Sequence, residues 1–484
     1  MSTVYNEVWK DIFSSLPQEV NNPIDTKEKQ LFLPILEILK TIFFCLQDGI
    51  EQNDIAIKLL DSLSHLRKDV AFLNWKAMVE YDAKKYIRAF ETTEKILQIT
   101  KSGETYFNAG RTAYKANKLE KSKQYLQKAM DLMYGESAPI LDYAVTICTM
   151  GDFEGALEII ENIDKSSLDE KNEKIVDFNK GWHYIREDNF KEGIALLHLG
   201  REINVWGSHA GKYKKPMWNG QTEKGKTILM IGEGGIGDEV INARFAKTIK
   251  ERGMNVIMST VHKNERMLSQ IDGLRHVIRN DEINTLKGWD YWVPVMDLPY
   301  ILGIDKDEIP HEKYLTANPH YIDKWKKRIK SNKKLNIGIR WMGNPRYELE
   351  LARTIPLEYF EKLTDLDVQL WSIQKDDEKV GLKLPNNIID ISEELESWDD
   401  TMGAMMNFDL VITSCTSVAH IAGALGVPTW VVTPLLPYYI WADMKKESYW
   451  YDSVSLYRQK EWKNWNEPMK EVRKDLEEML CKLQ

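Results

Sequence analysis

The most constraining feature of this sequence is a pair of small residues that recurs four times in its N-terminal half. Ala, Gly or Ser occupies two positions twelve residues apart, and the pair returns after 33, 34 and 37 residues. The first positions are Ala77, Gly110, Ala144 and Gly181, and the second positions are Ala89, Ser122, Ala156 and Gly193. Two helices cross closely only where small side chains meet, and a single hairpin cannot bury its apolar face alone. The pattern therefore predicts stacked helical hairpins between residues 70 and 202.

These units resemble tetratricopeptide (TPR) repeats, with about four copies, although the Trp and Pro of that consensus are mostly absent. Residues 1–69 also have a helical pattern and are a candidate for a further, degenerate unit. A generic helical bundle is the alternative for the whole segment. In either case we expect residues 1–205 to form a helical domain that acts as a scaffold and carries no catalytic chemistry.

Beyond residue 206 the apolar pattern changes to short strands, most of them separated by helical stretches. The predicted strands are 227–231, 255–259, 335–341, 368–373, 409–413 and 428–432. They form two groups, joined by a charged helix and turn at 323–334. Alternating strands and helices are typical of parallel α/β sheets. We therefore predict two Rossmann-like halves, 206–330 and 331–484, with a cleft between them.

A glycine-rich loop, "IGEGGIGDEV" at 231–240, follows the first predicted strand and precedes a helix. Gly232, Gly234 and Gly237 spell G-x-G-x-x-G, which occurs in dinucleotide-binding folds. Such a site also needs an acidic residue about 20 positions later, at the end of the second strand. That strand ends in "MSTVH" (258–262) and has no acid. The sequence therefore argues against a nicotinamide cofactor.

Five blocks in order resemble the glycosyltransferase domain of bacterial TPR glycosyltransferases, related to the heptosyltransferases of glycosyltransferase family 9. The blocks are "PMWNGQTEKGKTILMIGEGGIGDEV", "IGIRWMGNPRYELELARTIP", "SIQK", "VITSCTSVAHIAGALGVPTWVV" and "PYYIWADMKKESYWYDSVSLYRQ". The resemblance covers about 206–475. It implies a GT-B fold, a nucleotide-sugar co-substrate and transfer without a metal ion or other cofactor. The donor would lie on the C-terminal half and the acceptor toward the N-terminal half.

Asp238, directly after the glycine loop, is the candidate catalytic base. Transfer with inversion needs a base that takes the proton of the acceptor hydroxyl, and Asp238 resembles the residue with that role in heptosyltransferase-like enzymes. Gly234, Gly235 and Gly237 would shape the loop at the cleft without gripping a cofactor. The alternative is that Asp238 only complements the dipole of its helix.

The donor site is predicted at the ends of the C-terminal strands. In "SCTSVAH", Thr416, Ser417 and His420 lie at a helix start that would suit a diphosphate, although they could instead serve as an N-cap and a packed histidine. Arg353 is the best candidate for the charge that compensates the leaving diphosphate, with Arg340 and Arg346 weaker. Further contacts are predicted for Gly343, Asn344, Gln374 and Lys375, each of which could instead be structural. Cys415 stands where the family usually has Asp, which leaves the sugar open.

The sequence predicts a metal-independent, inverting glycosyltransferase whose repeats position a protein or glycan acceptor. The alternative is a non-catalytic TPR scaffold with a degenerate transferase domain, which Cys415 would favour. No metal site is expected, because "DLD" (365–367) and "DKD" (305–307) do not end strands and no His, Cys and Glu cluster has metal spacing. The acceptor and the donor sugar stay open.

Composition limits the partners and the compartment. The formal net charge is −9, so nucleic acid is not an expected partner, although modified DNA stays open as an acceptor. The four cysteines are far apart, which fits a reducing compartment. The start of the chain has no signal-peptide pattern, and charges interrupt the most apolar stretch, 31–46, so no membrane span is expected. We expect a cytoplasmic protein.

Overall fold

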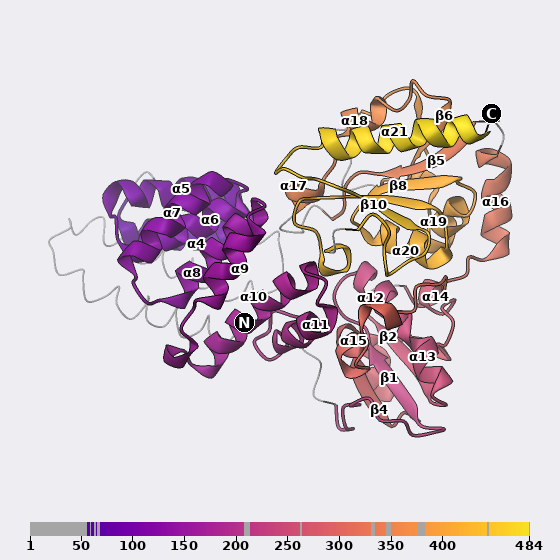
Figure 1. Cartoon of the computed structure of the whole chain (residues 1–484), viewed down its shortest axis with the longest axis horizontal. Helices are drawn as coiled ribbons and strands as arrows, with labels where there is room; N and C mark the ends of the chain where they lie inside the picture. The colour runs from indigo at the N-terminus through magenta and orange to yellow at the C-terminus, as the bar shows by residue number, and fades with distance from the viewer. Residues whose placement is uncertain are drawn as a thin grey trace. The chain divides into compact units, whose positions relative to one another are not determined.

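The computed structural model describes residues 56–58, 60–61, 64, 68–207, 213–261, 264–330, 334–344, 350–375, 383–442 and 445–483. The chain divides into two compact units, Met1–Thr112 and Ala113–Gln484. Figure 1 shows the helices and strands. The helical prediction for residues 1–69 falls mostly outside the described residues. The predicted domain limits at 205 and 330 stay predictions.

The helical repeat pattern is confirmed. Consecutive helices are α4 (Val70–Asp82), α5 (Tyr86–Ile99), α6 (Gly103–Lys115), α7 (Leu119–Leu132), α8 (Ser137–Thr149), α9 (Phe153–Glu161), α10 (Glu170–Arg186) and α11 (Phe190–Leu199). The first small residue of each predicted pair lies on α4, α6, α8 or α10, and the second on α5, α7, α9 or α11. The helices α4 to α11 therefore form an array of TPR-like helical hairpins.

The crossing of α10 and α11 shows why the small residues are needed. A Cβ atom added to Gly193 would lie 2.5 Å from Cγ1 of Ile185 and 2.9 Å from the carbonyl oxygen of Gly181. A Cβ atom on Gly181 would in turn lie 2.9 Å from the carbonyl oxygen of Gly193. Real Cβ atoms do not approach backbone oxygens this closely, so the helices would have to separate.

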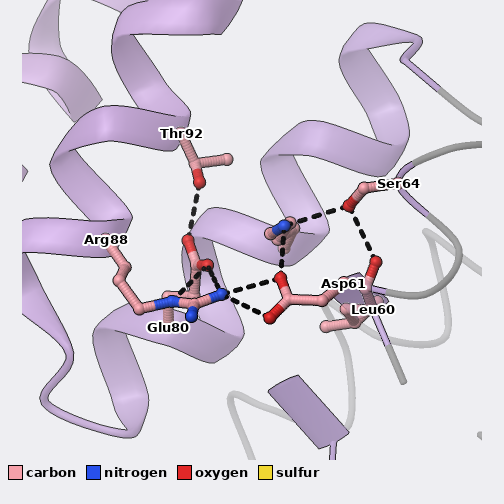
Figure 2. Close-up of polar contacts among 7 residues, drawn as sticks. Leu60, Asp61, Ser64, Glu80, Arg88 and Thr92 are labelled. Atoms are coloured by element: carbon pink, nitrogen blue, oxygen red, sulfur yellow. Dashed lines mark hydrogen bonds and ion pairs between the residues drawn. The ribbon is translucent and has the colours of Figure 1, made fainter. Parts of the chain in front are cut away.

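Within the first unit, a polar cluster fixes the α4–α5 hairpin (Figure 2). Glu80 of α4 is 1% exposed, and its carboxylate accepts hydrogen bonds from Arg88 Nε at 3.2 Å and Thr92 Oγ1 at 2.7 Å. Asp61 joins the same arginine to Lys76, with both ion pairs at 2.7 Å. A buried carboxylate is costly unless it is paired, so the cluster selects one register for the two helices.

The N-terminal Rossmann-like half contains a four-stranded parallel sheet in the order β3-β2-β1-β4. Its strands are β1 (Thr227–Ile231), β2 (Asn255–Thr260), β3 (His276–Arg279) and β4 (Tyr291–Pro294). The helices are α12 (Ile236–Ala243), α13 (Phe245–Glu251), α14 (Glu265–Leu268) and α15 (Leu298–Ile301). Every residue of β1 is buried, as expected for the central strand of a sheet covered on both faces.

The C-terminal half has a six-stranded parallel sheet in the order β10-β9-β8-β5-β6-β7 (Figure 1). Its strands are β5 (Leu335–Arg340), β6 (Val368–Ser372), β7 (Ile388–Asp390), β8 (Leu410–Ser414), β9 (Thr429–Thr433) and β10 (Val454–Arg458). Its helices are α17 (Glu350–Arg353), α18 (Leu357–Glu361), α19 (Trp398–Met405), α20 (Ser417–Leu425) and α21 (Asn466–Leu483). The helix α16 (Pro319–Ile329) links the two halves and packs on α19.

The two parallel sheets confirm the predicted fold class, a helical repeat array followed by an α/β domain of GT-B type. All six predicted strands are present, with ends that differ by one residue at most. Strands β3, β4, β7 and β10 were not predicted. The charged segment at 323–334 is helical as far as Ile329. The side chain of Trp325 is buried, so one face of this helix packs in the core.

The last helical hairpin belongs to the core of the α/β domain. Ile185, Phe190 and Leu197 of α10 and α11 lie in one apolar cluster with residues of both sheets. After α11, Arg201 pairs with two buried carboxylates of the N-terminal half, Glu233 at 2.7 Å and Asp297 at 2.7 Å. Ordinary repeats contact only their neighbours, so this hairpin has a second packing role.

Candidate active site

A cavity of about 1600 Å³ is lined by both Rossmann-like halves and by Thr149 at the end of α8. Pockets for small ligands usually have roughly 300–1,000 Å³, so this cavity has room for a donor together with part of an acceptor. The predicted residues that line it are Gly235, Gly237, Asp238, Gly343, Asn344, Arg353, Lys375, Thr416, Ser417 and His420. Gly234 and Gln374 are not among its lining residues.

The glycine loop is a tight strand-to-helix turn. Gly234 has a φ of +72°, which favours glycine, and a Cβ atom there would lie 2.7 Å from Oδ2 of Asp238. Gly232 passes so close to β2 that a Cβ atom would lie 2.2 Å from the carbonyl oxygen of Ser259. These glycines are explained by the turn and its packing, without a dinucleotide.

Asp238 occupies the first turn of α12 and is held through both carboxylate oxygens. Oδ2 accepts a hydrogen bond from the backbone N–H of Gly235 at 2.7 Å, and Oδ1 accepts one from the hydroxyl of Tyr438 at 3.0 Å. Burial raises the pKa of Asp238, and the nearby Glu233 carboxylate acts in the same direction, while the two hydrogen bonds oppose the rise. The helix-dipole alternative therefore explains only part of its surroundings.

The first turns of α12 and α20 meet at the cavity. A Cβ atom on Gly237 would lie 3.0 Å from Cδ2 of His420 and 3.7 Å from Cα of Ser417. Thr416 is the N-cap residue of α20, yet its side chain makes no capping hydrogen bond to the helix. Two helix N-termini thus present backbone N–H groups and positive dipole ends to the same space, which favours an anion.

His420 lies on the cavity wall but is deeply buried, with its ring stacked on Trp441 at 5.1 Å between centroids. Its Nδ1 lies 3.2 Å from the hydroxyl oxygen of Tyr451. Burial lowers the pKa of His420 to about 3, and the positive charges of Arg244 and Arg353 add to this effect. The imidazole is therefore neutral and can contact a diphosphate only as a hydrogen-bonding group.

Arg353 is fixed beside the start of α20. Its Nε pairs with Glu350 at 2.6 Å, and its Nη1 donates to the carbonyl oxygen of Cys415 at 2.9 Å. Glu350 is buried and also accepts the backbone N–H of Gly343 at 2.5 Å. One carboxylate therefore orients both the guanidinium and the loop after β5. Sequence reasoning missed Glu350, whose only signal was its position three residues before Arg353.

Gln374 and Lys375 follow β6 as predicted, but their side chains have different surroundings. Gln374 is fully buried, and its amide oxygen accepts the backbone N–H of Met342 at 3.1 Å. Lys375 lines the cavity, and its ammonium group donates to the carbonyl oxygen of Leu395. Gln374 thus holds the loop after β5 through the backbone of Met342. A direct contact with the donor stays a prediction for Lys375.

Cys415 and Arg340 also line the cavity. The Cys415 side chain is buried, and burial raises the pKa of its thiol to about 11, so it is a neutral group at pH 7. Arg340 donates from Nε to the carbonyl oxygen of Met342 at 3.1 Å. Arg346 lies outside the described residues.

A contact between the two halves also lines the cavity. Arg266 of α14 pairs through Nε with Asp399 of α19 at 2.8 Å, and Gln270 donates to the same carboxylate at 3.1 Å. Asp399 is 2% exposed. Neither Arg266 nor Asp399 was a predicted site residue, because they are more than a hundred positions apart and match no local motif.

Two searches over the described residues concern metals and membranes. No group of three or more His, Cys, Asp or Glu side chains there could hold a metal ion. The expectation of metal-independent chemistry stays a prediction. In the same parts of the chain, each helix falls short of the length or the apolar character needed to cross a bilayer.

Comparisons of the sequence give one distant relative. No family model matches the chain. Protein FlbA of Caulobacter vibrioides is 23% identical over 58% of this chain and 54% of that protein. The chain thus spans about half the length of the curated relative that it matches.

Comparisons of the structure give two groups of proteins. Over its C-terminal part, the chain is similar to a glycosyl transferase family 9 structure from Veillonella parvula, at 12% identity and a TM-score of 0.42, covering 55% of this chain and 99% of that one. Over its helical part it is similar to YrrB, described as a TPR protein with an unusual peptide-binding site, at 16% identity and a TM-score of 0.27, covering 35% and 84%. MamA of Desulfovibrio magneticus is similar at 15% identity and a TM-score of 0.29, covering 35% and 95%. At these levels of similarity, the chemistry of the chain must be argued from its own residues.

Proposed function

We propose that the chain is a metal-independent glycosyltransferase that moves a sugar, with inversion, from a nucleotide-sugar donor to an acceptor. One observation carries the proposal. A carboxylate of the N-terminal half, Asp238, lies in the same cavity as the N-terminus of α20 in the C-terminal half, next to Arg353. A base and an anion site that face one cavity from two domains are the two groups that this reaction needs.

In this mechanism, the donor's diphosphate binds at the start of α20. Its charge is compensated by the exposed backbone N–H groups, the hydroxyls of Thr416 and Ser417, and the Arg353 guanidinium. The loop of Gly343 and Asn344 lies against the donor, and Lys375 lies toward its nucleoside. Glu350 and Gln374 already hold the backbone of the loop after β5. Little reorganisation of this loop is therefore needed when charge develops on the leaving group.

Asp238 acts from the acceptor side. One carboxylate oxygen takes the proton of the acceptor hydroxyl as the hydroxyl oxygen forms a bond to the anomeric carbon. The bond from that carbon to the diphosphate oxygen breaks at the same time, and the nucleoside diphosphate leaves with the electron pair. Attack opposite to the leaving group inverts the anomeric centre. The raised pKa of Asp238 makes it a stronger base than an exposed aspartate.

The acceptor is a protein or glycan segment that reaches the cavity along the helical array. Thr149 at the end of α8 lines the same cavity as Asp238, which gives an acceptor bound to these repeats a route into the cavity. The alternative function, a non-catalytic scaffold, rests on Cys415, which leaves a neutral thiol where related transferases have a carboxylate.

A thermal-shift screen against nucleotides and nucleotide sugars tests the proposal, because a ligand that binds only the folded state raises its melting temperature. We expect stabilisation by one nucleoside diphosphate and its sugar conjugates, and slow hydrolysis of that conjugate without an acceptor. The Arg353→Ala variant serves as the control for binding at this site. Stabilisation without hydrolysis or transfer would favour the scaffold, and no stabilisation by any member of the panel would contradict the transferase.

A further inference from the structure

Tyr438 joins the candidate base to the helical array. It lies at the start of the aromatic segment 438–441, after β9, and it lines the cavity. Its hydroxyl donates to Oδ1 of Asp238 at 3.0 Å, across 200 positions of sequence. This hydrogen bond connects Asp238, in the N-terminal half, with the C-terminal half.

The Tyr438 ring is in turn packed against the last helical hairpin. The centroid of the Trp182 ring, on α10, lies 6.0 Å from that of Tyr438 and 6.3 Å from that of Tyr439. Trp182 itself packs edge-on against Phe178 and Trp206, at 6.2 Å each. Rings held from several sides lose their alternative rotamers, so the position of the phenol depends on α10.

We propose that Tyr438 is the positioning residue for the Asp238 carboxylate, and that Trp182 of the helical array holds Tyr438 in place. This inference rests on the proposed function of Asp238. It gives the last hairpin a part in the chemistry besides any role in acceptor binding, because Trp182 of this hairpin packs against the phenol that orients the base.

The physical basis is the fixing of both carboxylate oxygens. With Gly235 N–H on Oδ2 and Tyr438 O–H on Oδ1, the plane of the carboxyl group is set, while each oxygen keeps a lone pair for the acceptor's proton. A base held in one orientation accepts the proton along a defined line. Without the phenol, only the N–H of Gly235 holds the carboxylate, and rotation about χ2 is less restricted.

The same hydrogen bond tunes the proton affinity of Asp238. A donor to the ionised form lowers the pKa of a carboxyl group, here against burial and the Glu233 carboxylate, which both raise it. Tyr439, beside Tyr438, is fully buried and stays protonated, since burial raises the pKa of its phenol. His420 of α20 is neutral. Tyr438 therefore keeps the base ionised at a pH where burial alone would favour its protonated form.

The first test is the titration of Asp238 in the free, full-length protein, followed by carbon NMR of labelled aspartate carboxyls and assigned with Asp238→Asn. We expect Tyr438→Phe to raise the pKa of Asp238 by about one pH unit, the effect of one hydrogen bond to a carboxylate. Tyr449→Phe removes a hydroxyl from the same aromatic region and should leave the titration unchanged. A natively melting Tyr438→Phe protein with the wild-type pKa of Asp238 would overturn the proposal.

The second test concerns Trp182. Trp182→Leu removes the support but keeps the phenol, so we expect the pKa of Asp238 to rise by less than in Tyr438→Phe and kcat to fall severalfold, with the KM for the donor unchanged. Trp182→Phe keeps an aromatic ring and should restore most of both values. If Trp182→Leu folds and titrates like the wild type, the helical array does not hold Tyr438.

Turnover separates this inference from the proposed function. In a transfer or donor-hydrolysis assay, Tyr438→Phe should move the acidic limb of the pH profile upward by the same amount as the Asp238 titration. If the NMR titration shifts but Asp238→Asn retains the full rate, Tyr438 positions Asp238 and the base assignment is wrong. If the NMR titration does not shift while Asp238→Asn abolishes transfer, the enzyme stands and this inference fails.

Discussion

At the scale of single residues, Asp238 is the side chain on which the proposed chemistry depends. Asp238→Asn retains the size of the side chain and an oxygen that can accept the N–H of Gly235, but it cannot take a proton. General-base catalysis is typically worth about 10²- to 10⁴-fold, so we expect kcat for transfer to fall by that order with donor affinity unchanged. The exposed Asp281, also in the first turn of a helix, provides a matched Asp→Asn control. A full rate in a natively melting Asp238→Asn protein would rule out the base.

Arg353 tests the anion site at the same scale. Arg353→Ala should weaken nucleoside diphosphate binding by about 1.5–3 kcal/mol, the contribution of a charge-assisted hydrogen bond, as measured by calorimetry. Because the change also leaves the buried Glu350 without its partner, Arg353→Lys serves as a second variant that keeps a positive charge. Equal diphosphate affinity in the wild type and both variants, with native melting, would remove Arg353 from the site.

The buried histidine gives a prediction about pH. The pKa of His420 is lowered to about 3 in the folded state, while an unfolded histidine titrates near 6.5. As the pH falls below about 6.5, the unfolded chain binds a proton that the folded chain does not. Stability is therefore lost toward acid, by about 1.4 kcal/mol per pH unit between pH 6 and 4. Urea unfolding of the wild type and His420→Gln should differ by this slope, and parallel curves would contradict it.

The site residues differ in whether a local sequence motif marks them. The sequence predicted the parts of the cavity wall at strand ends and helix starts, because the carboxyl ends of parallel strands and the following helix starts share one edge of a sheet. It could not predict that Tyr438 would reach Asp238, since that hydrogen bond joins residues 200 positions apart. Tyr438 stood out only as part of an aromatic run, and such runs usually form core. Glu350 and Asp399 carry no motif, and only the folded chain brings them to Gly343 and Arg266.

At the scale of elements, strand length and burial decided what could be predicted. The six predicted strands have five or six residues, whereas β3, β4 and β7 have three or four residues. Such short segments do not show a period, and β4 ends in a proline, Pro294. The strand β10 has five residues, but the aromatic residues Tyr449, Trp450 and Tyr451 shortly before it hide its alternation.

The crossing of α10 and α11 tests the small-residue pattern as an element property. Gly193→Ala improves helix propensity by about 1 kcal/mol, but its Cβ atom would meet Ile185 and the backbone of Gly181 within 2.9 Å. Overpacking against backbone costs about 1–3 kcal/mol, so we expect a net loss in the free energy of unfolding. The exposed Lys191→Ala in the same helix is the control for propensity. Higher stability of Gly193→Ala would show that the helices can separate at no cost.

Arg201 tests the connection between α11 and the glycine loop. Arg201→Met leaves Glu233 and Asp297, both about 1% exposed, without their shared cation. Removing one partner from a buried ionic group costs about 3–5 kcal/mol, and urea unfolding should show a loss of that order. A triple variant that also carries Glu233→Gln and Asp297→Asn should recover part of it. No loss in the single variant would mean that the carboxylates are protonated or rehydrated.

At the scale of the whole molecule, the packing of the last hairpin into the α/β core makes the TPR-like array and the α/β domain inseparable at their junction. Deleting residues 1–100 removes α4 and α5 but keeps α6 whole, and the second compact unit, Ala113–Gln484, is retained. We expect this chain to unfold cooperatively and to keep any thermal shift that a nucleoside diphosphate induces.

Deleting residues 1–202 also removes Ile185, Phe190, Ile194 and Leu197 from the core cluster that contains both sheets. Each fully buried apolar side chain contributes about 1.5–3 kcal/mol, and native domains are stable by only about 5–15 kcal/mol. The shorter chain should therefore aggregate or melt without cooperativity. A monomeric 203–484 chain that melts like the longer one and responds equally to the nucleotide would show that the hairpin is dispensable, and that the α/β domain begins where the repeats end.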